Sequence, residues 1–436
     1  MSESETSITA ESKERESIEP VIYEASEHSI QKNDIDEDAR KVVYRLQRAG
    51  FKAYIVGGGV RDILLGKKPK DFDISTDATP KQIKSLFRNC RIIGRRFKLC
   101  HIFFAHGKTL EVSTFRDFVA PQEAPEEEGQ PTTPVAPVAN DNLYGTEETD
   151  ALRRDLTING LFLDVSTMEI IDYVNGMKDL KQGIVRIIGE PEVRFREDPV
   201  RMLRVVRHSA RNGFHIDPRC WETILANSAL ITQSSQVRVF DELKKDFTSG
   251  CFLTILSLLG ETGLLEYLLP ELLENNSRLL SAESDFSICL ERIDDLVTEG
   301  EDVSPTVVLA IIALFTAGDS IWLRDLADSI GEVGELADRL SSAFTRLMVP
   351  RKERERIQML LTQWSRLRAV APKNLKAGAY KRSQLLHELI SLMEIAGFTR
   401  EDGQRLHILK SLLDSEHGVH EHHDHPQKPS HLQRRR

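Results

Sequence analysis

Cysteine is scarce in this chain, and the few cysteines present are not grouped. The 436 residues contain five, which are Cys90, Cys100, Cys220, Cys251 and Cys289. An odd number at wide spacings, without a C-x-x-C pair, fits neither a disulfide framework nor a zinc knuckle. At this length the chain has room for two or more domains, each with its own hydrophobic core.

Long apolar runs are also absent. The longest run, Val307 to Phe315, is far shorter than the about 20 residues that a helix needs to cross a bilayer. The N-terminus, Met-Ser-Glu-Ser-Glu-Thr-Ser, lacks the basic and apolar regions of a secretory signal. These absences predict a cytoplasmic protein without a membrane partner.

The net charge of −10 is unevenly distributed. Residues 1–40 hold twelve acids and four bases, and residues 119–150 hold eight acids and no base, which leaves the rest of the chain at about +6. Residues 351–382 alone carry ten Lys or Arg and two Glu. Such a surplus suits a polyanion, although a solvated helical face has the same composition.

Composition and periodicity divide the chain into five predicted segments. Residues 1–38 are rich in Ser and Glu and poor in aromatic residues, which predicts disorder. A head of mixed strands and helices follows over 39–182, with a Pro- and Glu-rich loop at 119–142. Helical patterns then predict a neck at 183–250 and a body and tail at 251–415, before a disordered His- and Arg-rich end at 416–436.

The head predicts an α+β fold with a small mixed β-sheet. Thr79 and Pro80 have the residue types of an N-cap and a first helical position. Strands are expected at 51–56, 71–75, 90–93, 101–105, 110–115, 161–165 and 170–173, and helices at 39–49, 79–88 and from 147. Beyond the head, helices are expected at 253–273, 287–297, 307–315, 321–330, 354–369 and 383–396.

Asp71-Phe72-Asp73 is the most informative stretch. In a strand, both carboxylates point to one face and Phe72 to the core, which is a geometry for a divalent metal. The pair lies ten residues beyond Arg61, in Val56-Gly57-Gly58-Gly59-Val60-Arg61-Asp62, whose glycines predict a turn that a phosphate can approach. Isolated D-x-D pairs are common in turns and caps. Here the context predicts nucleotide chemistry, with Asp71 and Asp73 as metal ligands.

A third carboxylate usually completes such a site, and two candidates are present. Glu111 lies on the strand Leu110-Glu111-Val112-Ser113-Thr114, and Asp155 follows Arg153-Arg154. Glu111 also fits an ordinary strand residue that faces solvent, and Asp155 an ordinary helix cap. The choice between them stays open. Arg154 is a candidate phosphate ligand, because a guanidinium group matches phosphate oxygens in pairs.

Arginines recur with helical spacing after Asp198-Pro199. This dipeptide predicts a helix start with Asp198 as the N-cap. Arg201, Arg204, Arg207 and Arg211 then share one face. Four cations in this arrangement repel one another unless an anion or a carboxylate from another element meets them. We expect a bound nucleotide to supply that anion, although an exposed basic face has the same pattern.

Together these motifs resemble the class II nucleotidyltransferases of the polymerase β superfamily, which include bacterial tRNA CCA-adding enzymes and bacterial poly(A) polymerases. The resemblance runs from Phe51 to Phe214, and Leu259 to Leu272 is similar to the helical part of the family. Ile92-Ile93-Gly94-Arg95-Arg96-Phe97-Lys98-Leu99 resembles the signature of the poly(A) polymerase branch. Cys100 departs from that branch, where a small residue such as Ala is usual.

The resemblance implies a role for each matching residue. Asp71 and Asp73 match the metal-binding catalytic pair, and Asp155 matches the third catalytic acid. Asp198 and Arg201 would face the adenine base, so that side chains select ATP without a template. Positions that contact the incoming nucleotide are matched by Gly58, Arg61, Arg154, Asp198, Arg201, Arg204 and Arg207.

The resulting prediction is a monomeric adenylyltransferase that adds AMP from ATP to RNA 3′ ends, with Mg²⁺ or Mn²⁺ as cofactor. It implies polyadenylation linked to mRNA processing and decay, with RNA-decay proteins as partners. A tRNA CCA-adding enzyme is the alternative with the same chemistry. A non-catalytic RNA-binding protein with a decayed head is disfavoured by the three retained acids and the arginine helix.

Overall fold

The chain divides into two compact units. The computed structural model describes residues 18–94, 98–117, 144–274, 284–316, 343–375, 385–397 and 399–417. The head unit is Met1–Arg194 with Phe214–Cys220, and the helical unit is Phe195–Gly213 with Trp221–Arg436. The predicted loop at 119–142, the helix at 321–330 and nearly all of the segment 416–436 lie outside the described residues. The predicted neck and body boundaries stay predictions.

The head unit is built on a mixed sheet of eight strands in the order β1-β8-β7-β2-β3-β6-β5-β4. Adjacent strands are antiparallel except for β3 and β6, which are parallel. This confirms the mixed sheet. The strands are β1 (Val21–Tyr23), β2 (Ala53–Val56), β3 (Asp73–Thr76), β4 (Cys90–Ile93), β5 (Leu99–Phe103), β6 (Thr109–Thr114), β7 (Leu161–Leu163) and β8 (Ile170–Asp172).

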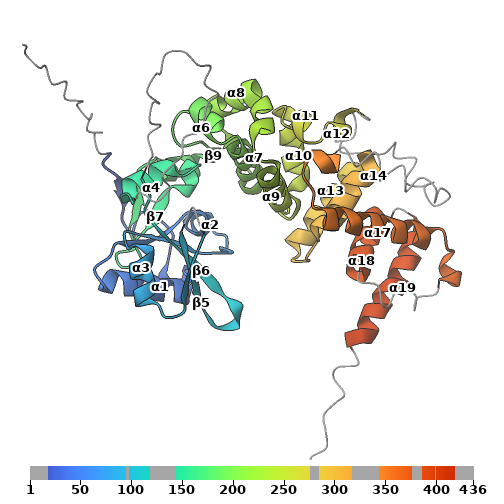
Figure 1. The fold of residues 1–436 in the computed structure, drawn as a ribbon, viewed down its shortest axis with the longest axis horizontal. Coiled ribbons are helices and arrows are strands. Elements are labelled where there is room, and N and C mark those ends of the chain that lie inside the picture. Colours follow the sequence, from blue (N-terminus) through green and yellow to red (C-terminus); the bar gives the residue numbers. More distant parts are fainter. Residues whose placement is uncertain are drawn as a thin grey trace, which may run out of the picture. The chain divides into compact units, whose positions relative to one another are not determined.

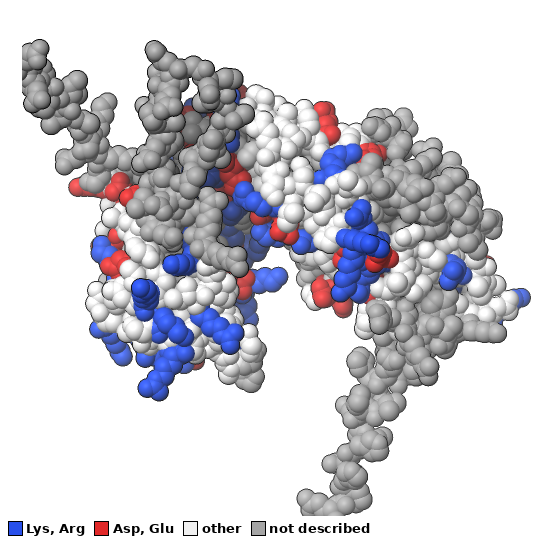
Figure 2. All heavy atoms as spheres, in the orientation of Figure 1, with Lys and Arg blue, Asp and Glu red and all other residues white. Residues whose placement is uncertain are grey.

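Two helices, α1 (Glu37–Arg48) and α3 (Pro80–Leu86), pack against the sheet and enclose the main core of the head (Figure 1). The predicted cap of α3 is confirmed, because the Thr79 side chain accepts from the Gln82 N–H and the Gln82 side chain reaches back. Lys and Arg side chains gather around α1 and α3 on the surface seen in Figure 2. The opposite face of the sheet carries the site described below.

The prediction of disorder for residues 1–38 is wrong over 18–38. Strand β1 pairs with β8 and forms one edge of the sheet. Ile30 and Ile35 are buried in the core of the head, so this Ser- and Glu-rich segment is held by a few apolar anchors. Average composition missed them because two well-placed side chains suffice to anchor a short segment.

The predicted strand at Asp71 begins two residues too early, since β3 starts at Asp73. The predicted glycine turn is also shorter than expected. Only Gly57 adopts a positive φ, of 72°, and helix α2 (Gly58–Leu64) begins with the next two glycines. Phe72 packs against the core as predicted.

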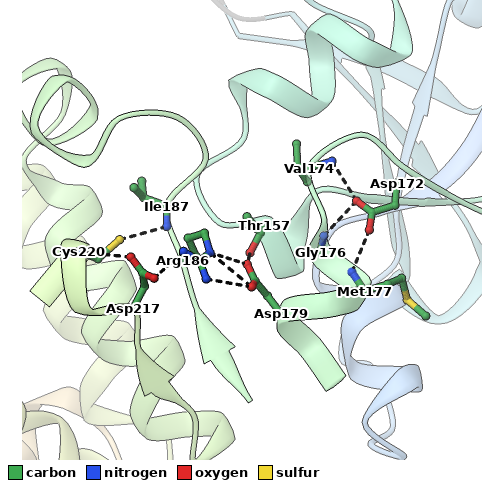
Figure 3. A network of polar contacts seen from close by, with 10 residues as sticks. All are labelled: Thr157, Asp172, Val174, Gly176, Met177, Asp179, Arg186, Ile187, Asp217 and Cys220. Atoms are coloured by element: carbon green, nitrogen blue, oxygen red, sulfur yellow. Dashed lines mark hydrogen bonds and ion pairs between the residues drawn. The ribbon is translucent and has the colours of Figure 1, made fainter. Parts of the chain in front are cut away.

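A polar network joins the later elements of the head, α5 (Gly176–Gln182), β9 (Ile184–Val185), β10 (His215–Ile216) and the first three residues of α8 (Pro218–Asn227) (Figure 3). Arg186 donates to Asp179 over 3.0 Å and also binds Asp217, and Thr157 donates to Asp179 over 2.7 Å. Asp172 accepts from the N–H groups of Val174, Gly176 and Met177 at the start of α5. These bonds fix the backbone that follows helix α4 (Glu147–Arg153).

The described part of the helical unit is entirely helical, as predicted. The helix expected at 253–273 is divided into three, because Gly263 has a φ of 71° and Pro270 lacks an N–H. Among the described residues, no helix is both long and apolar enough to cross a membrane. The helices include α7 (Val200–Asn212), α9 (Gln236–Phe247), α10 (Phe252–Glu261), α11 (Leu265–Leu268), α12 (Glu271–Glu274), α13 (Asp285–Thr298), α14 (Pro305–Thr316), α17 (Arg351–Arg368), α18 (Leu386–Ala396) and α19 (Arg400–His417), and α6 (Pro191–Glu197) spans the boundary with the head.

Candidate active site

Asp73 and Glu111 are neighbours on the open face of the sheet. They are direct partners in the parallel register of β3 and β6, and Asp73 also pairs with Val56 at the end of β2. Both carboxylates lie in a depression of about 350 Å³. The described residues that line it are Val56, Asp73, Ile74, Leu99, Glu111, Ser113, Arg116, Asp150, Arg153 and Arg154.

Gly57 brings the backbone close to this depression. A Cβ atom at this position would lie 3.4 Å from Arg154 Nη1 and 3.9 Å from Asp73 Oδ2. The positive φ already favours glycine, and the close approach adds a second reason. Glycine at position 57 therefore leaves room beside the Asp73 carboxylate and the Arg154 guanidinium group.

The pKa of Asp73 is raised above its ordinary value. Desolvation of the carboxyl group by the surrounding protein atoms is the main cause, although the residue as a whole is exposed at the start of β3. The charges of Glu111 and Asp71 act in the same direction, whereas Arg154 opposes them. A carboxyl group whose pKa is raised by neighbouring carboxylates is poised to accept a cation. Asp71 itself lies just before β3 and is exposed. Its nearness to Asp73 therefore does not arise from alternation along a strand.

Arg154 spans the depression from the end of α4. Its Nη2 donates to Asp150 Oδ2 over 3.0 Å and to Ser75 Oγ over 3.2 Å, and its guanidinium carbon lies 5.2 Å from the centre of the Phe162 ring. The side chain keeps about one fifth of its surface exposed. A cation held in this way retains the ability to meet an anion in the depression.

Arg61 has a different environment from the one expected. It is only 3% exposed, and its guanidinium group donates to Asp62 Oδ1 over 2.6 and 2.9 Å and to Asn159 Oδ1 over 2.6 Å. A Cβ atom on Gly58 would lie 3.3 Å from Arg61 Nη2. In this structure Arg61 therefore supports α2 from inside the head.

Asp155 is buried, with 9% of its surface exposed. Its Oδ1 accepts from the Leu156 N–H over 2.8 Å, and its backbone oxygen accepts from the Ile188 N–H over 2.8 Å. Among the described residues, those that line the depression with Asp73 include Glu111 but not Asp155. The register of β3 and β6 therefore places Glu111 beside Asp73, and the choice of the third acid between Glu111 and Asp155 stays a prediction.

Sequence reasoning missed Asp150 and Arg116. Asp150 lines the depression, holds Arg154, and accepts from the Arg116 N–H over 3.4 Å. The spacing of Asp150 and Arg154, four residues apart in a predicted helix, was the available signal. Arg116 lies two residues after the end of β6, but only the folded sheet shows that it lines the depression.

The arginines of α7 lie in the helical unit and are partly bound by carboxylates. Arg207 is only 7% exposed and binds Asp246 and Glu242 of α9, the latter over 2.5 Å. The charge of Arg207 is the main influence that lowers the pKa of Glu242 against its burial. Arg201 Nη1 donates to Glu197 over 2.9 Å. Carboxylates thus meet Arg207 and Arg201, which is one of the two ways in which the repulsion along this helix was expected to be relieved.

Asp198 does not cap α7 with its side chain. The helix begins at Val200 after Pro199, and Arg201 N–H donates to the backbone oxygen of Asp198. The Asp198 carboxylate instead accepts from Arg238 Nη2 over 2.7 Å. A preceding helix, α6, leaves the dipeptide as a link between two helices, which explains why the capping prediction failed.

The residues present fit a divalent cation. In the part of the chain that the structure describes, no group of three or more His, Cys, Asp and Glu side chains forms a complete metal cage. Magnesium does not need one, because it commonly binds one or two carboxylates together with water and substrate phosphates. The paired carboxylates of Asp73 and Glu111 are oxygen ligands of this kind.

Comparison with known proteins agrees with this geometry. Residues 53–186 match the family model described as "Poly A polymerase head domain", and residues 213–275 match the one described as "Probable RNA and SrmB- binding site of polymerase A". The crystal structure of the Bacillus stearothermophilus CCA-adding enzyme in complex with CTP has a TM-score of 0.57 at 23% identity, covering 90% of this chain and 89% of that one. The fold and the head define a nucleotidyltransferase of the polymerase β type, a class that uses divalent metals.

Comparison with sequence relatives distinguishes the poly(A) polymerase branch of the class from the CCA-adding enzymes. Poly(A) polymerase I of Salmonella typhimurium is 39% identical over 343 residues, which cover 76% of this chain and 72% of the relative. The CCA-adding enzyme of Staphylococcus saprophyticus is 34% identical over 222 residues, about half of each chain. The chain belongs to the bacterial poly(A) polymerase I family of class II nucleotidyltransferases. The predicted branch is therefore confirmed, and RNA and ATP are the substrates that this family implies.

Proposed function

We propose that Asp73 and Glu111, together with Asp71, hold the divalent cations of this poly(A) polymerase, Mg²⁺ or Mn²⁺, at the open face of the head. The observation that carries the proposal is the register of β3 and β6, which makes the Asp73 and Glu111 carboxylates direct neighbours. Bound cations would activate the attacking hydroxyl group and offset the charge of the leaving group. Asp155 then supports the backbone behind the site.

In the proposed reaction, the 3′-hydroxyl group of RNA attacks the α-phosphate of ATP. A new phosphodiester bond forms, the bond to the β-phosphate breaks, and pyrophosphate leaves. Arg154 faces the depression and is placed to bind the triphosphate while Asp150 and Ser75 hold its orientation. The open backbone at Gly57 leaves room for phosphate oxygens beside it.

The remaining nucleotide contacts have separate roles in this proposal. Arg201, Arg204 and Asp198 are the residues of the α7 region that would meet the base and ribose of ATP. Arg207 and Arg61 would instead hold α7 and α2 in place, because both are buried against carboxylates. Gly58 would allow Arg61 its close approach. A cytoplasmic location, a monomeric state and RNA-decay partners stay predictions.

Replacement of the acids one at a time tests the proposal. Asp73→Asn and Asp71→Asn should each lower AMP incorporation into RNA by about a thousandfold or more while the far-ultraviolet circular dichroism stays unchanged. Lys41→Ala is the control. Lys41 is an exposed charged residue on α1, which packs on the face of the sheet opposite the site, and its replacement should retain full activity. An active Asp73→Asn protein would contradict the proposed site.

A further inference from the structure

The open face of the sheet continues beyond the carboxylates to the edge strand β4. In the register of the strands, Asp73 lies opposite Glu111, Glu111 opposite His101, and His101 opposite Arg91. These four residues therefore form one row across β3, β6, β5 and β4. Three strand spacings of about 4.8 Å make the row roughly 14 Å long.

Side chains on β5 alternate between the core and this open face. Cys100 and Ile102 are fully buried, whereas Leu99, His101 and Phe103 point to the other side. Phe103 is 37% exposed and Ile93 of β4 is 44% exposed. Leu99 also lines the depression that holds Asp73 and Glu111. The apolar surface is thus continuous with the carboxylate site.

A cation and two aromatic rings pack together on this surface. The guanidinium carbon of Arg91 lies 5.5 Å from the centre of the Phe103 ring, and the rings of His101 and Phe103 meet edge to face with centroids 6.4 Å apart. His101 Nε2 lies 3.2 Å from Glu111 Oε1. Exposed aromatic rings beside a cation are the arrangement that holds single-stranded nucleic acid, because bases stack on the rings and the cation offsets phosphate charge.

We propose that Arg91, His101 and Phe103 form a platform for the single-stranded 3′ segment of the RNA primer. This inference rests on the proposed function, since the platform leads to the acids that would act on the RNA 3′ end. RNA is favoured over other occupants by the charge of Arg91 and by the continuity of the surface with the site. The length of the row matches a few nucleotides at 3.4 Å per stacked base.

Steady-state kinetics with a short unstructured oligoadenylate as primer test the platform. Phe103→Ala should raise KM for the primer about tenfold or more, because loss of one stacked base commonly has an effect of this size. The KM for ATP should stay within about twofold of wild type. Phe103→Tyr keeps the aromatic face and should restore most of the primer affinity, and Arg91→Ala should add to the defect of Phe103→Ala.

Ile22→Ala is the matched control, because Ile22 is an exposed apolar residue on β1 at the opposite edge of the same sheet. It should leave both KM values unchanged. A thermal melt of each variant separates loss of folding from loss of binding. A primer KM for Phe103→Ala equal to that of wild type, with Asp73→Asn inactive, overturns the platform and leaves the carboxylate site standing. A fully active Asp73→Asn protein would overturn the proposed site independently.

Discussion

The head and the helical unit use clustered charge in opposite ways. In the head, Asp73 and Glu111 are adjacent carboxylates, and their mutual repulsion contributes to the raised pKa of Asp73. On α7 of the helical unit, the buried cation Arg207 is bound by Asp246 and Glu242 of the same unit. A cluster whose charges the protein does not balance is a candidate for binding a ligand, whereas a balanced one stabilises the fold.

The same contrast separates two arginines inside the head. Arg61 is buried and bound to Asp62 and Asn159, while Arg154 lies at the wall of the depression and keeps part of its surface exposed. Sequence motifs assign both to the nucleotide. Burial and partners are consistent with the proposal that Arg154 contacts the nucleotide directly and that Arg61 supports α2.

The largest expected effect separates Glu111 from Asp155. Glu111→Gln should lower kcat for AMP addition by about a hundredfold or more, because it removes a charge beside Asp73. Asp155→Asn should reduce kcat by less than tenfold. Single-turnover rates at saturating ATP and RNA measure both. The reverse order of the two variants would restore Asp155 as the third acid.

The second prediction concerns the balanced cluster of the helical unit. Arg207→Ala should lower the free energy of unfolding by about 3 kcal/mol, because it leaves the buried Asp246 carboxylate without its cation and Glu242 with Lys245 as its remaining cation. Arg201→Ala, which loses one partly exposed pair, should change stability by about 1 kcal/mol or less and instead raise KM for ATP. Urea unfolding and ATP kinetics distinguish the two. Equal losses of stability in Arg207→Ala and Arg201→Ala would contradict the different roles given to these two arginines.

The smallest effect is a gain in stability at the active site. Because the pKa of Asp73 is raised in the folded protein, its contribution to stability is present at low pH and is lost as the pH rises through the folded value. Asp73→Asn should therefore raise Tm of the metal-free protein at pH 7 by about 1–2 °C, and the gain should vanish near pH 3. Added Mg²⁺ should stabilise the wild type more than the variant. A lower Tm for the variant at pH 7 would contradict the proposed repulsion.

Much of the fold was predictable from local pattern. Thr79 and Pro80 predict the start of α3, and apolar runs predict most strands of the sheet. The start of β3 at Asp73, two residues later than predicted, could not be read from the sequence. Asp71 and Asp73 have the same local spacing whether or not both belong to the strand. The pairing of β1 with β8 was also hidden, since it joins residues about 150 positions apart.

The kind of site could be predicted from the sequence, but not all of the residues that line it. The acid pair, the glycine motif and Arg154 follow from residue types at short spacing. The nearness of Glu111 to Asp73 required the register of β3 with β6, and the pairing of Arg207 with carboxylates required the packing of α7 on α9. Both depend on contacts between distant segments, which no local pattern contains.

The central claim is that the protein adds AMP to RNA at a site where the carboxylates on the open face of the head hold the divalent cations. Its most direct test supplies all four nucleoside triphosphates and Mg²⁺ to the protein with an unstructured RNA and, in a parallel reaction, with a tRNA that lacks its CCA end, and determines the nucleotides added to each. We expect long tails of A alone from the wild type and none from Asp73→Asn. CMP incorporation confined to tRNA ends, or tails of undiminished length from Asp73→Asn, would contradict the account.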